Sequence, residues 1–240
     1  MARKPNKQSA DYDDSVFVNC PFDSQYKPVF NAIVFTIILC GFRARCALEI
    51  DDGSQPRIEK IFSIIERCRF GIHDLSRTEL DDHSQLPRFN MPLELGMFLG
   101  VKRCGGRVQR QKTCLVLDTE RYRYQKFMSD IAGQDIQAHG GEQRRAIAAV
   151  RNWLRTASGR TLPGGAEVFR RYQLFERALP QVCRHAELDP AEVTFADFVS
   201  LAVEWLKVDL PARRPIARGS RGRLFRCPAL HLAQGSRIAA

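Results

Sequence analysis

The chain has 240 residues, 44% of them hydrophobic and 27% charged, a composition that excludes a collagen-like or wholly disordered protein. The net charge is +10, but residues 1–10 carry three basic and no acidic residues, and residues 211–240 carry seven arginines and no acidic residue. The segment between these ends is therefore neutral, and nucleic-acid binding would depend on the ends alone.

Hydropathy and cysteine usage narrow the class of protein further. The longest apolar stretch, residues 32–42, is much shorter than the roughly 20 residues of a membrane span. The first residues show no apolar segment of a signal peptide. The eight cysteines include no Cys-x-x-Cys pair, which disfavours a zinc ribbon. We therefore expect a reduced, cytoplasmic protein that does not contact a membrane.

In chain order, a basic and flexible N-terminus of residues 1–14 is expected to precede five strand–helix pairs. The predicted strands span 15–20, 42–50, 70–75, 112–118 and 135–139, and the predicted helices span 23–40, 58–65, 92–102, 119–132 and 142–156. Such alternation predicts an α/β domain over residues 15–158, with a five-stranded parallel sheet covered by helices on both faces.

The C-terminal part of the chain has a different pattern. Residues 162–165 form a linker, and residues 166–210 are predicted to be a helical appendage that packs on the sheet domain or on a partner. Within it, one helix is expected to end at Pro180, and Thr194 and Asp197 resemble a capping box. The arginine-rich tail, residues 211–240, is expected to be disordered; its single aromatic residue offers almost no platform for stacking on nucleic-acid bases.

Parallel sheets of this kind bind ligands beyond the carboxyl ends of their strands. This rule selects a small set of candidate residues, which follow the first, third and fourth strands or begin the helix after the third. They are Asn19, Pro21, Phe22, Asp23, His73, Asp74, Ser76, Pro92 and Asp118.

The segment from Asn90 to Gly96 carries the most informative acid. If Pro92 is the first helical residue, Glu94 lies in the first turn, where the helix dipole keeps a carboxylate ionised. An ionised carboxylate can attack an anomeric carbon or stabilise its positive charge. The alternative is that Glu94 only caps the helix, because glutamate is favoured in any first turn.

Three short motifs together resemble the nucleoside 2-deoxyribosyltransferase-like branch of the bacterial TIR-like superfamily. They are Pro21-Phe22 after the first strand, the sequence His-Asp-Leu-Ser at 73–76, and Asn-Met-Pro-Leu-Glu-Leu-Gly at 90–96. The resemblance implies a flavodoxin-like fold and cleavage or transfer of an N-glycosidic bond. It implies that Glu94 is the catalytic carboxylate and that Asp74 binds sugar hydroxyls or transfers protons. Asn90 then lines the pocket, and residues 21–23 hold the base or phosphate.

The resemblance thus implies an N-glycosidase or glycosyltransferase acting on a nucleoside, nucleotide or NAD-like substrate, and it allows a role as a bacterial stress or antiphage effector. No cofactor is expected, and the chain is expected to form a homo-oligomer. The alternative is a TIR-like module that binds a nucleotide or a protein without turnover. There is no dinucleotide-binding or P-loop glycine motif.

Several polar residues near the predicted site leave two interpretations open. The cluster from Ser129 to His139 either lines the pocket or caps a helix, with capping favoured. A metal site built from the histidines and acids of residues 73–83, namely His73, Asp81, Asp82 and His83, is less favoured than a solvated loop. Cys20 is either a reactive thiol or, as favoured, a buried inert one.

Overall fold

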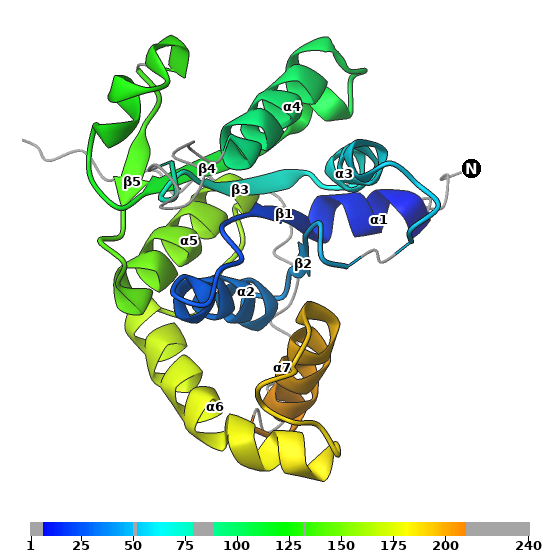
Figure 1. The fold of residues 1–240 in the computed structure, drawn as a ribbon, viewed down its shortest axis with the longest axis vertical. Coiled ribbons are helices and arrows are strands. Elements are labelled where there is room, and N and C mark those ends of the chain that lie inside the picture. The colour runs from blue at the N-terminus through cyan, green and yellow to red at the C-terminus, as the bar shows by residue number, and fades with distance from the viewer. Residues whose placement is uncertain (1–6, 50–51, 79–88, 132, 210–240) are drawn as a thin grey trace, which may run out of the picture. The chain divides into compact units, whose positions relative to one another are not determined.

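The computed structural model describes residues 7–49, 52–78, 89–131 and 133–209. Its sheet has five strands: β1 (Ser15–Asn19), β2 (Arg43–Arg45), β3 (Phe70–Asp74), β4 (Thr113–Asp118) and β5 (Ile136–Ala138). All neighbouring strands run parallel, in the order β2-β1-β3-β4-β5 (Figure 1). This order is that of a flavodoxin-like fold, and it confirms the predicted α/β class.

The central strands are buried along their whole length, which explains their near-continuous apolar sequences. All five residues of β1 and all five of β3 are buried. Asn19 pairs with His73, and Asp74 pairs with Leu117, the residue before the end of β4. The polar residues that end β1, β3 and β4 therefore reach the same edge of the sheet.

Seven helices surround the sheet in the described part of the chain. They are α1 (Lys7–Asp14), α2 (Lys27–Leu39), α3 (Arg57–Glu66), α4 (Asn90–Cys104), α5 (Gln143–Ser158), α6 (Gly165–His185) and α7 (Phe195–Asp209). Helices α3 and α4 pack together on one face, and α2 packs with α5 on the other (Figure 1). On the α4 face, Phe98 lies so close to Gly71 that a Cβ there would come within 2.7 Å of its ring.

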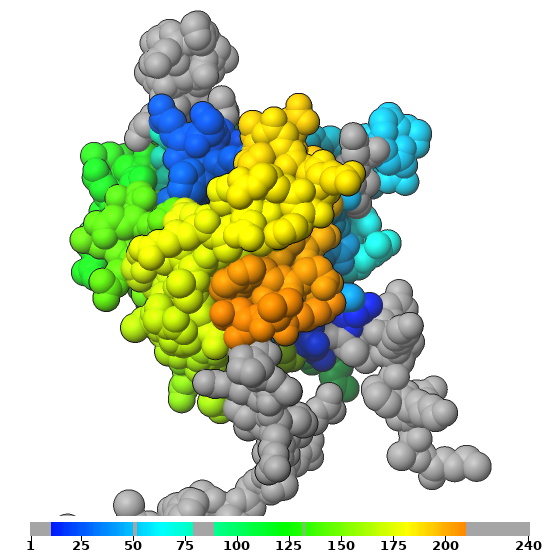
Figure 2. Space-filling model, turned by 90° about the horizontal axis from the view of Figure 1, so that it is seen from below, coloured from blue at the N-terminus to red at the C-terminus, as the bar shows by residue number. Residues whose placement is uncertain are grey.

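The helical appendage packs on the sheet domain, one of the two arrangements expected from the sequence. Helices α6 and α7 both contact α2, and they lie against each other in the yellow and orange surface of Figure 2. The ring of Phe35 in α2 stacks on Phe175 at 5.1 Å and also contacts Tyr172 and Trp205. Helix α2 is thus buried between the sheet and the appendage, as its apolar sequence requires.

The capping box at the start of α7 is confirmed. The Thr194 backbone N–H donates to Asp197 Oδ2 at 3.1 Å, and the Asp197 N–H donates to Thr194 Oγ1 at 3.2 Å. These reciprocal bonds satisfy backbone donors that the helix itself leaves unpaired.

Three predicted elements need correction. The strand expected over 42–50 has only three residues, because the chain turns after Arg45 and the Arg45 guanidinium pairs with Glu49. The helix expected over 119–132 is wrong: residues 123–126 and 129–131 form two short 3₁₀ helices. The helix expected to end at Pro180 continues to His185.

The ends of the chain differ in what the structure describes. Residues 7–14, expected within a flexible N-terminus, form α1, and the Tyr12 hydroxyl donates to the Val108 carbonyl at 3.0 Å. The predicted disordered tail and the loop acids Glu79, Asp81 and Asp82 with His83 lie outside the described residues. Among the residues that are described, no helix is both long and apolar enough to cross a membrane.

Candidate functional site

Helix α4 begins at the point where the strand order reverses, between β1 and β3. The side-chain amide of Asn19 donates two hydrogen bonds, one to the Met91 carbonyl at 2.8 Å and one to His73 Nδ1 at 3.1 Å. Burial lowers the pKa of His73 to about 3, so its ring is neutral. Asn19 therefore fixes the first turn of α4 on the crevice where flavodoxin-like folds bind ligands.

Glu94 is carried by this helix and is buried, with 7% of its surface exposed. Burial raises the pKa of its carboxyl to about 7, and the charge of Arg57 in α3 opposes the rise. No hydrogen bond or ion pair of Glu94 with a described residue offsets the burial. A carboxyl with such a pKa populates both protonation states near neutral pH, as acid–base catalysts require.

The prediction that the helix dipole keeps Glu94 ionised is wrong. Helix α4 begins at Asn90, two residues before Pro92, so Glu94 is the fifth helical residue and lies beyond the first turn. The dipole acts mainly within that turn, and the loss of hydration on burial outweighs it.

Asp74 ends β3 in a very different setting, with no exposed surface and four donors. Its Oδ2 accepts from the Tyr26 hydroxyl at 2.5 Å and from His139 Nε2 at 2.8 Å. Its Oδ1 accepts from the Ser76 backbone N–H at 2.8 Å and from the Ser76 hydroxyl. Burial alone would raise the pKa of Asp74, but the bonds from His139, Ser76 and Tyr26 hold it below its usual value.

His139 joins this network from the loop between β5 and α5. Its Nδ1 accepts from the backbone N–H of Gly141 at 2.9 Å, so the ring proton lies on Nε2, facing Asp74. Both Gly140 and Gly141 have positive φ, which allows the loop to turn back over the ring. His139 is therefore part of the Asp74 network and not a helix cap.

The residues after β1 are held by polar contacts of their own. Asp23 accepts from the Tyr26 backbone N–H at 3.0 Å and forms an ion pair with Arg77 at 3.1 Å. Pro21 is buried, whereas the side chain of Phe22 is 39% exposed and lines a cavity against α7. The prediction that residues 21–23 hold a base or phosphate stays a prediction.

The remaining candidates lie on either side of the strand ends. Asn90 is exposed at the start of α4, and Pro92 is half-buried. Asp118 ends β4, where its Oδ1 accepts from the Thr119 N–H at 2.7 Å and pairs with Arg123 at 2.6 Å. Asp118 Oδ2 is buried without a hydrogen-bond partner in the described chain, and burial raises the pKa of this carboxyl.

The Cys20 thiol is affected by both carboxyls for which the sequence predicts a catalytic role, those of Asp74 and Glu94. Burial raises the pKa of its thiol well above the usual value, and the negative charges of Asp74 and Glu94 raise it further. The charges of both carboxyls thus act on this one thiol. The same shift supports the interpretation of Cys20 as a buried, inert thiol.

Three contributors to the site were not predicted from the sequence. Tyr26 and Arg57 were not among the candidate residues, and for His139 a capping role was favoured. Their positions depend on contacts across the fold, which no local pattern reveals. Within the described residues, no group of three or more histidine, cysteine or acidic side chains is placed to hold a metal ion.

Comparison of the chain with family models, curated proteins and solved structures finds no match.

Proposed function

We propose that the protein is an N-glycosidase or glycosyltransferase acting on a nucleoside, nucleotide or NAD-like substrate, with Glu94 as its catalytic carboxylate. The observation that supports this proposal is the buried Glu94 carboxyl, with a pKa of about 7, on a helix fixed at the switch point of the sheet, where folds of this kind bind ligands. A titratable buried group in a crevice is a candidate for catalysis on physical grounds.

In the proposed reaction, ionised Glu94 stabilises the positive charge that develops on the anomeric carbon as the bond to the base breaks. Its burial strengthens this effect, because little water screens the charge. Water or a second base then accepts the sugar. Since the ionised form acts, the rate should rise with pH and level off above about pH 7.

Asp74 has a supporting role in this mechanism. Its two oxygens already accept four hydrogen bonds from the protein, which leaves little acceptor capacity for a sugar hydroxyl. Instead it holds Tyr26 and Ser76, and with them the loops after β1 and β3, beside the crevice. The same lack of free acceptor positions on Asp74 is the observation that favours the alternative function, a nucleotide-binding or interaction module without turnover.

The decisive experiment is to incubate the purified protein with NAD and a panel of nucleosides and nucleotides and to measure the free base by chromatography. Protein concentration is varied so that activation by self-association is detected. Glu94→Gln should lower base release by roughly 10²- to 10⁴-fold. The control Glu204→Gln removes an exposed carboxylate in α7 and its surface ion pair with Lys207, and it should leave the rate unchanged.

Two results would contradict the proposal. Base release that survives Glu94→Gln would remove Glu94 from the mechanism. Binding of a nucleotide without base release at any protein concentration would support the alternative, a non-catalytic module.

A further inference from the structure

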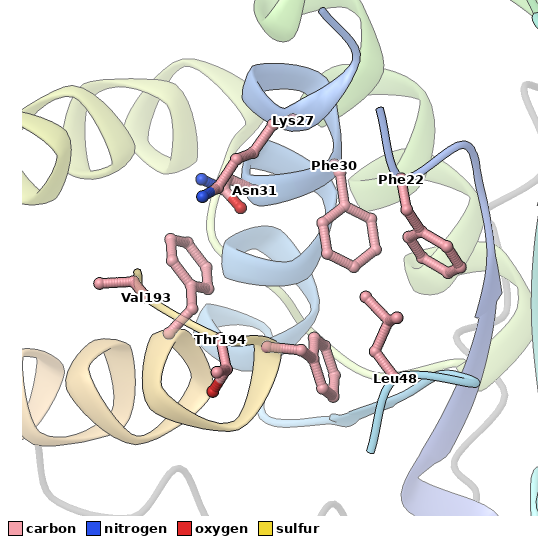
Figure 3. Close-up of a pocket in the computed structure, with 9 residues that line it drawn as sticks. Phe22, Lys27, Phe30, Asn31, Leu48, Val193 and Thr194 are labelled. Carbon is pink, nitrogen blue, oxygen red and sulfur yellow. The ribbon is translucent and has the colours of Figure 1, made fainter. Parts of the chain in front are cut away.

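An apolar cavity of about 200 Å³ lies between α2, the loops after β1 and β2, and the start of α7, outside the crevice described above. Phe22, Phe30 and Leu48 point toward one another across it, and Lys27 and Asn31 lie side by side at one end (Figure 3). Phe195 and Phe198 of α7 complete the lining.

The walls of this cavity are suited to an aromatic ring. Phe30 makes an edge-to-face contact with Phe22 at 5.4 Å and a tilted contact with Phe195 at 6.0 Å. Phe22 and Leu48 keep 39% and 45% of their surfaces exposed, although both border the same cavity. A ring bound there would cover these surfaces and gain further edge-to-face contacts.

The polar end of the cavity selects the charge of the ligand. The Lys27 ammonium is exposed and forms no ion pair or hydrogen bond with a described residue, and no acidic residue lies in the first turn of α2. Asn31 adds an amide beside it. An anionic group would therefore find an unpaired cation and a hydrogen-bond donor at one end of an aromatic pocket.

A neighbouring cavity limits where that anion can lie. It shares Lys27, Asn31 and Phe198 with the first cavity, but its lining includes the carboxylate of Glu176. Glu176 already accepts from Gln143 Nε2 at 3.1 Å and from the Tyr172 hydroxyl at 3.3 Å. Its charge repels a second carboxylate, so the anion is directed to the aromatic side of Lys27.

We propose that this cavity binds a small aromatic carboxylate, with the ring between Phe22, Phe30 and Leu48 and the carboxylate on Lys27. The volume is below the roughly 300–1,000 Å³ of drug-sized sites, which limits the ligand to about one ring. The inference does not depend on the proposed glycosidic activity.

The site also adjoins the loop that supports the crevice. Phe22 and Lys27 enclose the short segment that carries Tyr26, whose hydroxyl donates to Asp74. A ligand bound there would therefore touch residues on either side of the segment that carries one of the four Asp74 donors.

The test is a titration with phenylacetate as the carboxylate probe and phenylacetamide as its neutral counterpart, followed by protein-detected NMR. Phenylacetate should bind saturably at about millimolar concentration or below, and phenylacetamide roughly tenfold more weakly. Lys27→Gln should weaken phenylacetate binding roughly tenfold and leave the amide unaffected. Leu48→Gln should weaken both ligands.

The controls are Lys126→Gln and Leu174→Gln, which change an exposed lysine and an exposed leucine outside either cavity and should alter neither affinity. The Glu94→Gln variant should bind phenylacetate with the affinity of the wild type. This result would separate the proposed cavity ligand from the proposed enzymatic function. Absence of saturable binding, equal affinity for acid and amide, or binding that Leu48→Gln leaves intact would each overturn the proposal.

Discussion

Asp74 and Glu94 are both buried carboxyl groups whose charges act on the Cys20 thiol, yet their surroundings shift their own pKa values in opposite directions. Asp74 accepts four hydrogen bonds and has a lowered pKa. Glu94 is bonded to no described residue and has a pKa of about 7. Asp74 is the more deeply buried of the two and yet has the lower pKa, so the hydrogen-bond donors decide the protonation state.

This difference teaches which of the two groups can do chemistry. A carboxylate held by four donors is a fixed anion, since protonating it or moving it would break several bonds at once. A carboxyl that lacks partners is destabilised as an anion and gains from any positive charge that approaches it. The first group organises the strand ends, and the second is available to a ligand.

The largest expected effect comes from removing the negative charge of Asp74. In Asp74→Asn, an NH₂ group replaces one of the two acceptor oxygens. Depending on its orientation, this NH₂ group faces the donors of Tyr26 and His139 or those of Ser76, and it can accept from none of them. We expect the free energy of unfolding to fall by about 3–4 kcal/mol, measured by urea denaturation.

The matched control for this change is Asp135→Asn, at an exposed aspartate between the 3₁₀ helix of residues 129–131 and β5. It should change the free energy of unfolding by less than about 0.5 kcal/mol. Equal stability of the two variants would mean that the donors around Asp74 contribute nothing and would break the comparison.

The second prediction concerns the pH dependence of stability that Glu94 imposes. Its pKa is about 7 in the folded protein and 4.5 as the ordinary value, so the folded state binds the proton more tightly between these pH values. Stability from this residue is therefore full below about pH 4.5 and falls as pH rises toward 7. The loss amounts to about 3 kcal/mol.

Urea denaturation of the wild type and Glu94→Gln across pH 4.5–8 measures this effect as the difference between two curves. The variant should be the less pH-sensitive protein and the more stable one at pH 8. Asp74 has the opposite dependence, because its lowered pKa contributes stability above its ordinary pKa of 3.8 that is lost in acid. Parallel curves for wild type and variant would contradict the burial argument.

How far the sequence predicts this structure depends on whether a feature is local. The sheet, its parallel direction and the strand ends at Asp74 and Asp118 follow from apolar runs of about five residues between amphipathic helices. The start of α4 was misplaced because Pro92 suits the first helical position, whereas the bond from Asn19 to the Met91 carbonyl fixes an earlier start.

The candidate site was predictable only in part, for the same reason. The positions of Asp74 and Glu94 follow from the strand-end rule and the resemblance. Their pKa values do not. That of Asp74 depends on Tyr26 and His139, which lie 48 and 65 residues away in the chain, and that of Glu94 depends on burial and on the charge of Arg57 in another helix. No periodicity in the sequence encodes a contact over such a separation.

The third prediction concerns a variant in which Asp74 loses one of its four hydrogen-bond donors. With fewer donors, Asp74 becomes more like Glu94, which has none among the described residues. Tyr26→Phe deletes a 2.5 Å hydrogen bond without changing the size of the ring much. We expect a loss of about 1–2 kcal/mol in the free energy of unfolding, and a raised pKa of Asp74. Acid unfolding should therefore begin at a higher pH than in the wild type.

The control Tyr122→Phe removes the hydroxyl of a tyrosine that is 66% exposed and should leave both quantities unchanged. If Tyr26→Phe unfolds in acid at the same pH as this control, the remaining donors suffice, and the number of hydrogen bonds is not what separates the two carboxyls.

The smallest expected effect tests whether Glu94 responds to charge at all. Arg57, exposed at the start of α3, is the residue whose charge lowers the Glu94 pKa against the effect of burial. Arg57→Gln should raise that pKa further, by less than about one unit, because an exposed charge is well screened. Carbon-detected NMR of the Glu94 carboxyl measures the shift, and Arg107→Gln, another exposed arginine, is the control. An unchanged pKa in Arg57→Gln would mean that burial alone sets it. A raised one would show that a cation at this position stabilises the Glu94 anion, which is the property that the proposed reaction requires of it.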